Sequence, residues 1–435
     1  MNDTTNCRGL HYPMHAIVIG AGPAGSLAAL LLKRGGCEVT LIERHRFPRH
    51  KVCGECLSAF GREVLRRHGL DGLLENIGVE LVRTQLHAGG ETVQIDLPQP
   101  MLGISRAVLD LKLLDAAVSE GVNLLQPARV LAVVPLPLEG GGRGGGGSVE
   151  RQEYAESARR RDVSPGSAAH AAASLSADPK EWADQESRPP DSAPYPLPQG
   201  EGEKIAVRWA SADSAIAQLL QADVVVLANG AATFTGDKPA PTGDLGIKTH
   251  FRRVRADPGA ITLYAADGCY GGAAPIEDRR WNAAFSVPAE RVKTAGGDVA
   301  AVFDSLLSAD PAMAKAFTGA ERIEPWLASP LPRYSPCRDW PANVVPVGNA
   351  AAAIEPIGGE GMGLALRSAE LAVGAILSGQ LDSLHSQYKR LWQTRSMGCR
   401  LAALAMTQGR ATAWALGLLN VPTLAEAGMR LIGKA

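Results

Sequence analysis

The sequence has almost no net charge, and it lacks any long uninterrupted apolar run. Its 44 basic and 45 acidic residues leave a formal net charge of −1, so the chain has no basic field of the kind that attracts DNA or RNA. No apolar run reaches the roughly 18 residues that span a membrane. The N-terminus shows no basic region followed by an apolar run, so no signal peptide is expected. These absences disfavour a nucleic-acid-binding protein, a membrane-spanning protein and a secreted protein.

Cysteine is sparse, and its pattern excludes a disulfide framework. The seven cysteines are an odd number scattered through a long chain, so we expect reduced thiols and a cytoplasmic location. Cys53 and Cys56 form the one CxxC pair, which is typical of a redox pair or of half a zinc site. No second pair has zinc-ribbon spacing, so a four-cysteine zinc site is poorly supported. Isolated histidines without metal spacing are given no function and no metal site; they are His50, His68, His87 and His250.

Residues 135–203 contain little that could pack into a core. The stretch is rich in glycine, proline, serine and charge, and such a composition cannot offset the entropy lost on ordering. The flanking segments 128–134 and 204–209 have the pattern of strands. We therefore predict that 135–203 is a disordered insertion in the loop between these two strands.

A strand, a glycine turn, a helix and a second strand follow one another near the N-terminus. The strands are predicted at 15–20 and 37–43 and the helix at 23–34. In the GAGPAG turn, the first glycine allows a tight turn, the second lets a pyrophosphate approach, and the third permits close helix packing. A carboxylate ends the second strand and can accept both ribose hydroxyls of an adenosine. The residues concerned are Gly20, Gly22, Gly25 and Glu43. This context predicts a dinucleotide site that fits NAD or FAD equally.

A second glycine-rich turn favours FAD over NAD. A strand predicted at 343–348 leads through a proline and four glycines into a helix predicted at 361–377. Such a turn can place backbone N–H groups beside the flavin N1–C2 carbonyl, where negative charge gathers on reduction. No second GxGxxG follows a strand, so we expect no dedicated NAD(P)H domain.

The remaining pattern predicts an α/β fold. A Rossmann-type FAD/NAD(P)-binding domain is expected with a smaller sheet-rich substrate domain and a C-terminal helical tail. The expected FAD-binding domain comprises 14–77, 103–134, 204–245 and 339–380; the substrate domain comprises 78–102 and 246–338; and C-terminal helices occupy 381–435. Within these ranges we predict a hairpin at 80–97 and a helix at 298–317. The tail has apolar residues at every third or fourth position, which favours a packed helix pair and leaves peripheral contact with a membrane surface as an alternative.

Four segments resemble FAD-dependent oxidoreductases of the geranylgeranyl reductase type, within the wider para-hydroxybenzoate hydroxylase-like superfamily. They are IVIGAGPAG with LIER, KVCGECLS, ISRAVLDLKLLDAA and VGNAAAAIEPIGGEGMGLALRSAELA. The resemblance implies that Arg106 lies near the FAD pyrophosphate and ribose and that the backbone of Val130 holds the adenine. The full set of FAD-binding residues that it implies is Gly20, Gly22, Ala24, Gly25, Glu43, Arg44, Arg106, Val130, Gly348, Asn349, Gly361, Met362 and Gly363.

Two asparagines depart from that family's pattern. The family's usual Gly-Asp is Gly348-Asn349 here, and its Ala-Asp-Gly is Ala228-Asn229-Gly230. Both changes remove a negative charge and leave room for a weakened or reassigned flavin site. The resemblance also implies that Cys53 is catalytic and faces the isoalloxazine ring, with Cys56 structural. The alternative is that both are small buried residues beside a glycine turn.

The function expected from the resemblance is reduction of an apolar organic molecule, isoprenoid or polyketide-like, by FAD and transiently bound NAD(P)H. Oxygen insertion by a flavin-dependent monooxygenase is the first alternative, and a flavin- or NAD-binding protein without turnover is the second. The WxWxIP pattern of flavin-dependent halogenases is missing, which disfavours halogenation. Tyr270, Trp281 and Trp326 are candidates for apolar walls of the substrate cavity.

Overall fold

The computed structural model describes the chain in two long stretches with several short gaps in the second. The described residues are 13–135, 204–211, 214, 216–230, 243–266, 268–332, 335–336, 340–341 and 343–408. The predicted insertion therefore lies outside the described residues except for Pro135, and so does the tail beyond residue 408.

A five-stranded parallel sheet carries the N-terminal turn. Its order is β17-β10-β1-β2-β6, and every neighbouring pair is parallel. The strands are β1 His15–Ile19, β2 Glu38–Ile42, β6 Asn123–Leu125, β10 Val224–Leu227 and β17 Val344–Pro346. Side chains alternate between the two faces of β1: Ala16 and Val18 pack with the helices, whereas Ile17 and Ile19 pack against a small sheet. Both faces are thus covered, which explains the continuous apolar runs.

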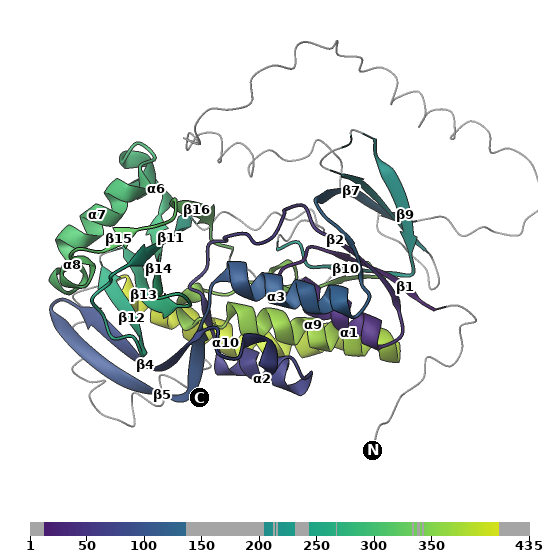
Figure 1. The fold of residues 1–435 in the computed structure, drawn as a ribbon, viewed down its shortest axis with the longest axis horizontal. Coiled ribbons are helices and arrows are strands. Elements are labelled where there is room, and N and C mark those ends of the chain that lie inside the picture. Colours follow the sequence, from purple (N-terminus) through teal and green to yellow (C-terminus); the bar gives the residue numbers. More distant parts are fainter. Residues whose placement is uncertain are drawn as a thin grey trace, which may run out of the picture. The chain divides into compact units, whose positions relative to one another are not determined.

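Helices α1 Pro23–Arg34, α3 Arg106–Ser119 and α9 Gly361–Ser378 cover one face of this sheet (Figure 1). The helix α9 also contacts α2 Ala59–Arg67 and α10 Leu384–Met406. Among the described residues α9 alone is long and apolar enough to cross a membrane, but 56% of that window is buried inside the protein. This burial is what a core helix of the α/β fold requires.

A three-stranded antiparallel sheet covers the opposite face. It has the order β7-β8-β9, with β7 Ala128–Pro135, β8 Ile205–Ser211 and β9 Gln218–Ala222. The pairing of β7 with β8 places Pro135 directly opposite Ile205. The segment 136–203 therefore joins two strand ends that are already neighbours.

A second, mixed sheet of nine strands forms the other part of the fold. Its order is β15-β11-β14-β13-β12-β4-β5-β3, with β16 also paired to β11. The strands are β3 Cys56–Leu57, β4 Val79–Ala88, β5 Glu91–Gly103, β11 Asp244–Arg252, β12 Ala260–Ala266, β13 Cys269–Ile276, β14 Arg280–Pro288, β15 Glu321–Arg322 and β16 Leu327–Pro330. The predicted hairpin is β4–β5, which turns at Gly89 and Gly90, both at positive φ.

Helices α6 Ala289–Thr294, α7 Val299–Ala309 and α8 Pro311–Phe317 accompany this sheet. The helical stretch predicted at 298–317 is found as two helices, because it is broken between α7 and α8. Pro311 cannot continue the hydrogen bonding of α7, and the Asp310 side chain instead caps α8 by accepting from Met313 N at 2.9 Å. The described part of the tail is helix α10, and the rest of the predicted helix pair lies outside the described residues. The α/β fold class with a second sheet and a helical C-terminal region is confirmed.

Candidate functional site

In the first glycine turn, packing leaves no room for a Cβ atom at two of the glycines but leaves room at the third. A Cβ on Gly20 would lie 2.6 Å from Ala228 O, and one on Gly25 would lie 1.8 Å from Gly20 O. A Cβ on Gly22 would meet nothing closer than Arg106 Nη2, at 3.7 Å. Gly22 also has an ordinary φ of −68°. The space beside Gly22 is therefore bounded by an arginine, and this is where a pyrophosphate is expected.

The N-terminus of α1 faces this space without a side-chain cap. Gly22 is the N-cap residue and Pro23 begins the helix. The N–H groups of Ala24 and Gly25 belong to the first turn, where no intrahelical acceptor exists. These donors and the positive end of the helix favour an anion.

Glu43 ties the turn to the end of β2. Its carboxylate is buried, with Oε2 accepting from Ala21 N at 2.7 Å and Oε1 accepting from His45 N at 2.8 Å. Each oxygen keeps a second lone pair, so ribose hydroxyls can still donate to Glu43. The next residue, Arg44, is exposed.

Three cations gather beside the turn. Arg106, at the start of α3, is buried and makes two hydrogen bonds of 2.7 Å to Asp110. Burial disfavours its charged form, but Asp110 outweighs this effect and raises the pKa of Arg106. Burial, followed by the charges of Arg106 and Arg49, lowers the pKa of Lys51 to about 8. An anion bound here would relieve the repulsion among the three cations.

Lys51 also reaches the end of β10. Its Nζ lies 3.1 Å from the Cβ position of Gly230, and the backbone of Ala228 in the same segment packs on Gly20. Neither Lys51 nor Arg49 was selected in the sequence, because isolated basic residues in a loop carry no spacing signal. The fold alone brings them to the phosphate turn.

The second glycine turn lies against the first. Gly348 has a φ of +58°, its N–H donates to Ser368 Oγ at 2.8 Å, and its Cβ position lies 3.2 Å from Ala24 Cβ. Asn349 follows and is half-buried. The two turns are more than 300 residues apart in sequence, so the structure brings together the two segments expected to hold FAD.

The remaining predicted cofactor residues fall into two environments. At the start of α9, Gly361 is exposed with nothing near its Cβ position, and Met362 is buried. A Cβ on Gly363 would lie 2.7 Å from Ser58 Oγ, so contact with α2 requires this glycine whatever its backbone N–H binds. Val130 is half-buried on β7, where the register with β8 shifts. Their roles toward FAD stay predictions.

Cys53 lies in a loop that is held on several sides. Its Sγ accepts from Glu55 N at 3.4 Å and contacts the Arg106 side chain, and its backbone oxygen accepts from Asn282 Nδ2 at 3.1 Å. Cys56 packs in a small apolar cluster that includes Leu81. Cys53 and Cys56 are both thiols, so the CxxC pair is not a disulfide.

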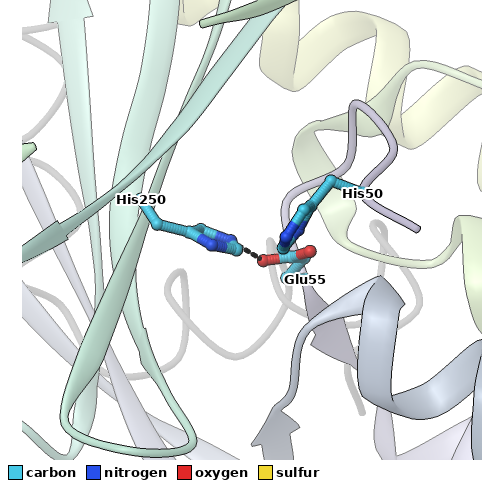
Figure 2. A group of neighbouring side chains, drawn as sticks. All are labelled: His50, Glu55 and His250. Carbon is cyan, nitrogen blue, oxygen red and sulfur yellow. Dashed lines mark hydrogen bonds and ion pairs between the residues drawn. The ribbon is translucent and has the colours of Figure 1, made fainter. Parts of the chain in front are cut away.

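A buried charged cluster, absent from the sequence-based predictions, lies directly beside Cys53. Glu55, Lys248 and His250 are 0%, 1% and 0% exposed. Glu55 Oε1 accepts from Lys248 Nζ and, at 2.8 Å, from Arg106 N, while Glu55 Oε2 lies 2.7 Å from His250 Nε2 (Figure 2). Burial raises the pKa of Glu55, but Lys248 and His250 outweigh burial, so the pKa is lowered and the carboxylate is ionised.

His50 completes this cluster. Its ring contacts the His250 ring nearly at a right angle, with 5.1 Å between centroids. Burial, and then the Lys248 charge, lower the pKa of His50. The position of Glu55 inside the CxxC pair was the one available signal for the cluster. Nothing in the sequence linked Glu55 to His250, which is 195 residues away.

The aromatic residues expected to line a cavity make packing contacts and a hydrogen bond within the fold. Trp281 is buried and Trp326 half-buried in the core that the sheet forms with α7 and α8, where Trp326 also contacts Phe303. Tyr270 is buried, its hydroxyl donates to Glu355, and it packs with residues of α10. The structure thus assigns the two tryptophans to packing.

Comparison with known proteins relates one segment to a named family. Residues 14–135 match the family model described as FAD binding domain. Menaquinone reductase of Mycolicibacterium smegmatis is 30% identical over 122 residues, covering 27% of this chain and 30% of that protein. Digeranylgeranylglycerophospholipid reductase 2 of Methanopyrus kandleri is 35% identical over 116 residues, covering 26% of this chain and 28% of that protein. The match therefore spans under a third of either relative.

Solved structures extend the likeness to the whole fold. The flavin-dependent brominase Bmp2 superposes with a TM-score of 0.70 at 16% identity, covering 98% of this chain and 94% of that one. PqsL of Pseudomonas aeruginosa, in complex with 2-aminobenzoylacetate, gives a TM-score of 0.65 at 18% identity, covering 93% and 100%. Residues 14–135 thus match an FAD binding domain, and the whole chain has a fold shared with the solved flavin-dependent enzymes. The geranylgeranyl reductase branch is one distant relative among several.

Proposed function

We propose that the protein is an FAD-dependent oxidoreductase. The carrying observation is the uncapped N-terminus of α1 at Gly22, where no protein atom fills the Cβ position and Arg106 bounds the space. Arg49 and Lys51 add positive charge there. This site fits the pyrophosphate of a dinucleotide, and the second turn at Gly348 fits its flavin end.

Different residues of the chain hold different parts of the cofactor. Glu43 accepts the ribose hydroxyls, the first-turn N–H groups and Arg106 hold the pyrophosphate, and the first turn of α9 offers N–H donors to the ring. Bound FAD supplies two-electron redox chemistry. Cys53 would lie beside the ring, where its thiol shapes the cavity or assists proton delivery.

NAD(P)H is proposed as a transiently bound reductant, and an apolar molecule as the substrate. No second GxGxxG directly follows a strand in the sequence, which supports the former. The names of two relatives, a menaquinone reductase and a digeranylgeranylglycerophospholipid reductase, support an apolar and isoprenoid-like substrate. The resemblance of the Cys53 segment to that of the reductases favours reduction over hydroxylation. Similarity to a kynurenine 3-monooxygenase, 34% identical over 123 residues, keeps hydroxylation as the second candidate.

The visible spectrum of the purified protein tests the cofactor, and anaerobic mixing with NADPH or NADH tests turnover. We expect oxidised-flavin bands that bleach on addition of the nicotinamide. Reoxidation by the soluble quinone menadione without oxygen supports a reductase, whereas product formation that requires oxygen supports a monooxygenase. A protein that reconstitutes with no flavin contradicts the proposal. If the bound flavin never bleaches, the protein binds flavin without turnover.

We propose that the protein is cytoplasmic and contacts a membrane surface through α10. Three apolar side chains, Met397, Leu401 and Leu404, are exposed on this helix. The helix carries Lys389, Arg390, Arg395 and Arg400 but no acidic residue, which suits anionic lipid. Co-sedimentation with vesicles of phosphatidylglycerol, compared with neutral vesicles, is the test. Equal recovery with both would contradict the proposal.

A further inference from the structure

The buried pair of Glu55 and His250 has the form of an oriented acid–base group. Glu55 is ionised and can only accept, so the hydrogen bond to Oε2 requires the proton on His250 Nε2. A carboxylate that fixes an imidazole in this way leaves the other nitrogen as the reactive one. That nitrogen, His250 Nδ1, is buried and has no hydrogen-bond partner among the described residues.

The strand geometry explains why His250 faces the Cys53 loop. On β11, Ile247 and Phe251 pack into the core under the helices, so Lys248 and His250 point to the opposite face, toward the Cys53 loop. Asn282 is the cross-strand neighbour of His250 on β14, and it donates to Cys53 O. Asn282 Oδ1 is likewise buried without a partner in the described structure. Buried polar atoms are normally satisfied, so two such atoms on adjacent strands indicate that a polar group of a ligand binds here.

A metal ion explains the cluster less well. His50, Glu55 and His250 are ligand types within 4.8 Å of one another. However, the Lys248 ammonium already neutralises Glu55 and is itself 1% exposed. A divalent cation would add two uncompensated charges to a buried site, which is costly.

We propose that His250 is the catalytic acid–base group of this protein, that Glu55 is its positioning residue, and that His50 connects it to solvent. The inference rests on the proposed oxidoreductase function. His50 suits the connection because it is half-exposed, with Nε2 3.6 Å from Glu324 and with a buried Nδ1 that no described residue bonds. Its lowered pKa keeps it neutral at pH 7, so it can accept a proton at one nitrogen and release one from the other.

The proton balance of the step is simple. Reduction of a quinone or an activated double bond adds one hydride and one proton. The nicotinamide supplies the electron pair by way of the cofactor, and doubly protonated His250 supplies the proton from Nδ1. The N–H bond breaks, an O–H or C–H bond forms on the substrate, and neutral His250 regains a proton through His50. Glu55 stabilises the imidazolium before this transfer.

The charged groups around His250 come from four elements. Lys248 lies on its own strand, Glu55 and His50 on the Cys53 loop, Glu324 on the segment after β15, and Arg106 on α3. Because these groups lie in contact, the pH profile of turnover belongs to the cluster as a whole, and removal of His250 must alter it.

The test is His250→Gln, because glutamine keeps an N–H donor for Glu55 but has no titratable nitrogen. Two measurements are made on it: menadione reduction by NADPH between pH 5 and 9 (a range set around the usual histidine pKa), and the FAD content. We expect FAD to stay bound and menadione reduction to slow by about 10²-fold or more, with loss of the histidine limb in the profile. His87→Gln is the matched control, since His87 is on β4 of the same sheet, bonded to Thr92, and outside the cluster. It should retain wild-type rates.

A second measurement does not need turnover. ¹⁵N NMR of histidine-labelled protein, with the His250 signal assigned by its loss in His250→Gln, should show the Nε2–H tautomer near neutral pH. The Nδ1–H tautomer, or a His250→Gln profile equal to wild type, overturns the inference. If the wild-type protein binds no flavin or does not oxidise NADPH, the proposed function fails instead, and the tautomer still decides the Glu55–His250 pair.

Discussion

Replacing Gly22 with valine separates the cofactor role of the first turn from its packing role. The backbone at Gly22 has φ −68° and ψ −178°, which any L-residue adopts without strain. Its Cβ would lie in ordinary contact, 3.7 Å from Arg106 Nη2. The folded protein therefore has no packing reason to reject a Cβ there. A dinucleotide pyrophosphate does have one, because the added methyl groups occupy its place beside the helix N-terminus.

The magnitudes of the two effects differ enough to be measured separately. Fixing a glycine by substitution stabilises a compatible site by about 0.4–1 kcal/mol through the unfolded state, so the cofactor-free variant should melt at the wild-type temperature or slightly above. Crowding a tight contact costs about 1–3 kcal/mol, which corresponds to a Kd for FAD about 5- to 150-fold higher. The assay is FAD released per protein after purification, together with thermal melting of the cofactor-free form.

Gly25→Ala is the matched control in the same turn. A Cβ on Gly25 would lie 1.8 Å from Gly20 O, so this variant should lower the melting temperature of the cofactor-free protein by several degrees, at about 2–4 °C per kcal/mol or less for a chain this long. Wild-type FAD content in Gly22→Val would refute the assignment of the turn to a pyrophosphate. A melting temperature as low as that of Gly25→Ala would refute the claim that the site beside Gly22 is open.

Three further predictions concern the proposed FAD site, and a fourth concerns the segment 136–203. Because the pKa of Lys51 is about 8 without an anion and a bound pyrophosphate raises it, FAD affinity should fall as pH rises through this value; Lys51→Met should bind more weakly at pH 7 and lose this dependence in titration calorimetry. Asn349→Asp should tighten FAD binding by about 1 kcal/mol, or about fivefold in Kd, and unchanged affinity would mean a site rebuilt around asparagine. Cys53→Ser should keep FAD but slow menadione turnover, and wild-type turnover would reduce Cys53 to packing. Replacing residues 136–203 with a four-residue glycine–serine turn should leave FAD content unchanged and should not lower the melting temperature, since β7 and β8 are already paired at that end and a shorter loop costs less closure entropy, about 0.6 kcal/mol for each halving of its length; a loss of several degrees would show that the segment stabilises the fold.

Local patterns were sufficient to predict the elements that carry the cofactor turn. The helix at 23–34 is found with the expected bounds, and the hairpin at 80–97 is found with its turn in place, although its second strand continues to Gly103. Both are dictated by short-range features: a glycine turn before a small-residue helix, and two alternating strands around paired glycines. The match of residues 14–135 to an FAD binding domain agrees with the dinucleotide site that the turn predicted.

The order of strands within the large sheet could not be predicted in this way. The strand β12 lies parallel to β4, with Ala260 opposite Arg83, and this pairing joins segments separated by most of the FAD-binding part of the chain. Periodicity identifies a strand but carries no information on its partner. The same limit hid the acid–base cluster, since a lone histidine in a strand usually indicates a packed residue until its neighbour across the fold is known.

The backbone of Glu55 supports a functional reason for this residue. Its φ of +56° is a conformation that glycine adopts freely and that costs other residues about 1–2 kcal/mol. Glycine at this position would remove the strain, but it would leave Lys248 as an unpaired buried charge, which costs about 3–5 kcal/mol. The carboxylate therefore outweighs the strain by holding Lys248, His250 and the Arg106 backbone at one point. Apolar side chains could have filled this volume without any of these charges, so the presence of both an ionised acid and an oriented histidine beside Cys53 is better explained by proton chemistry than by stability.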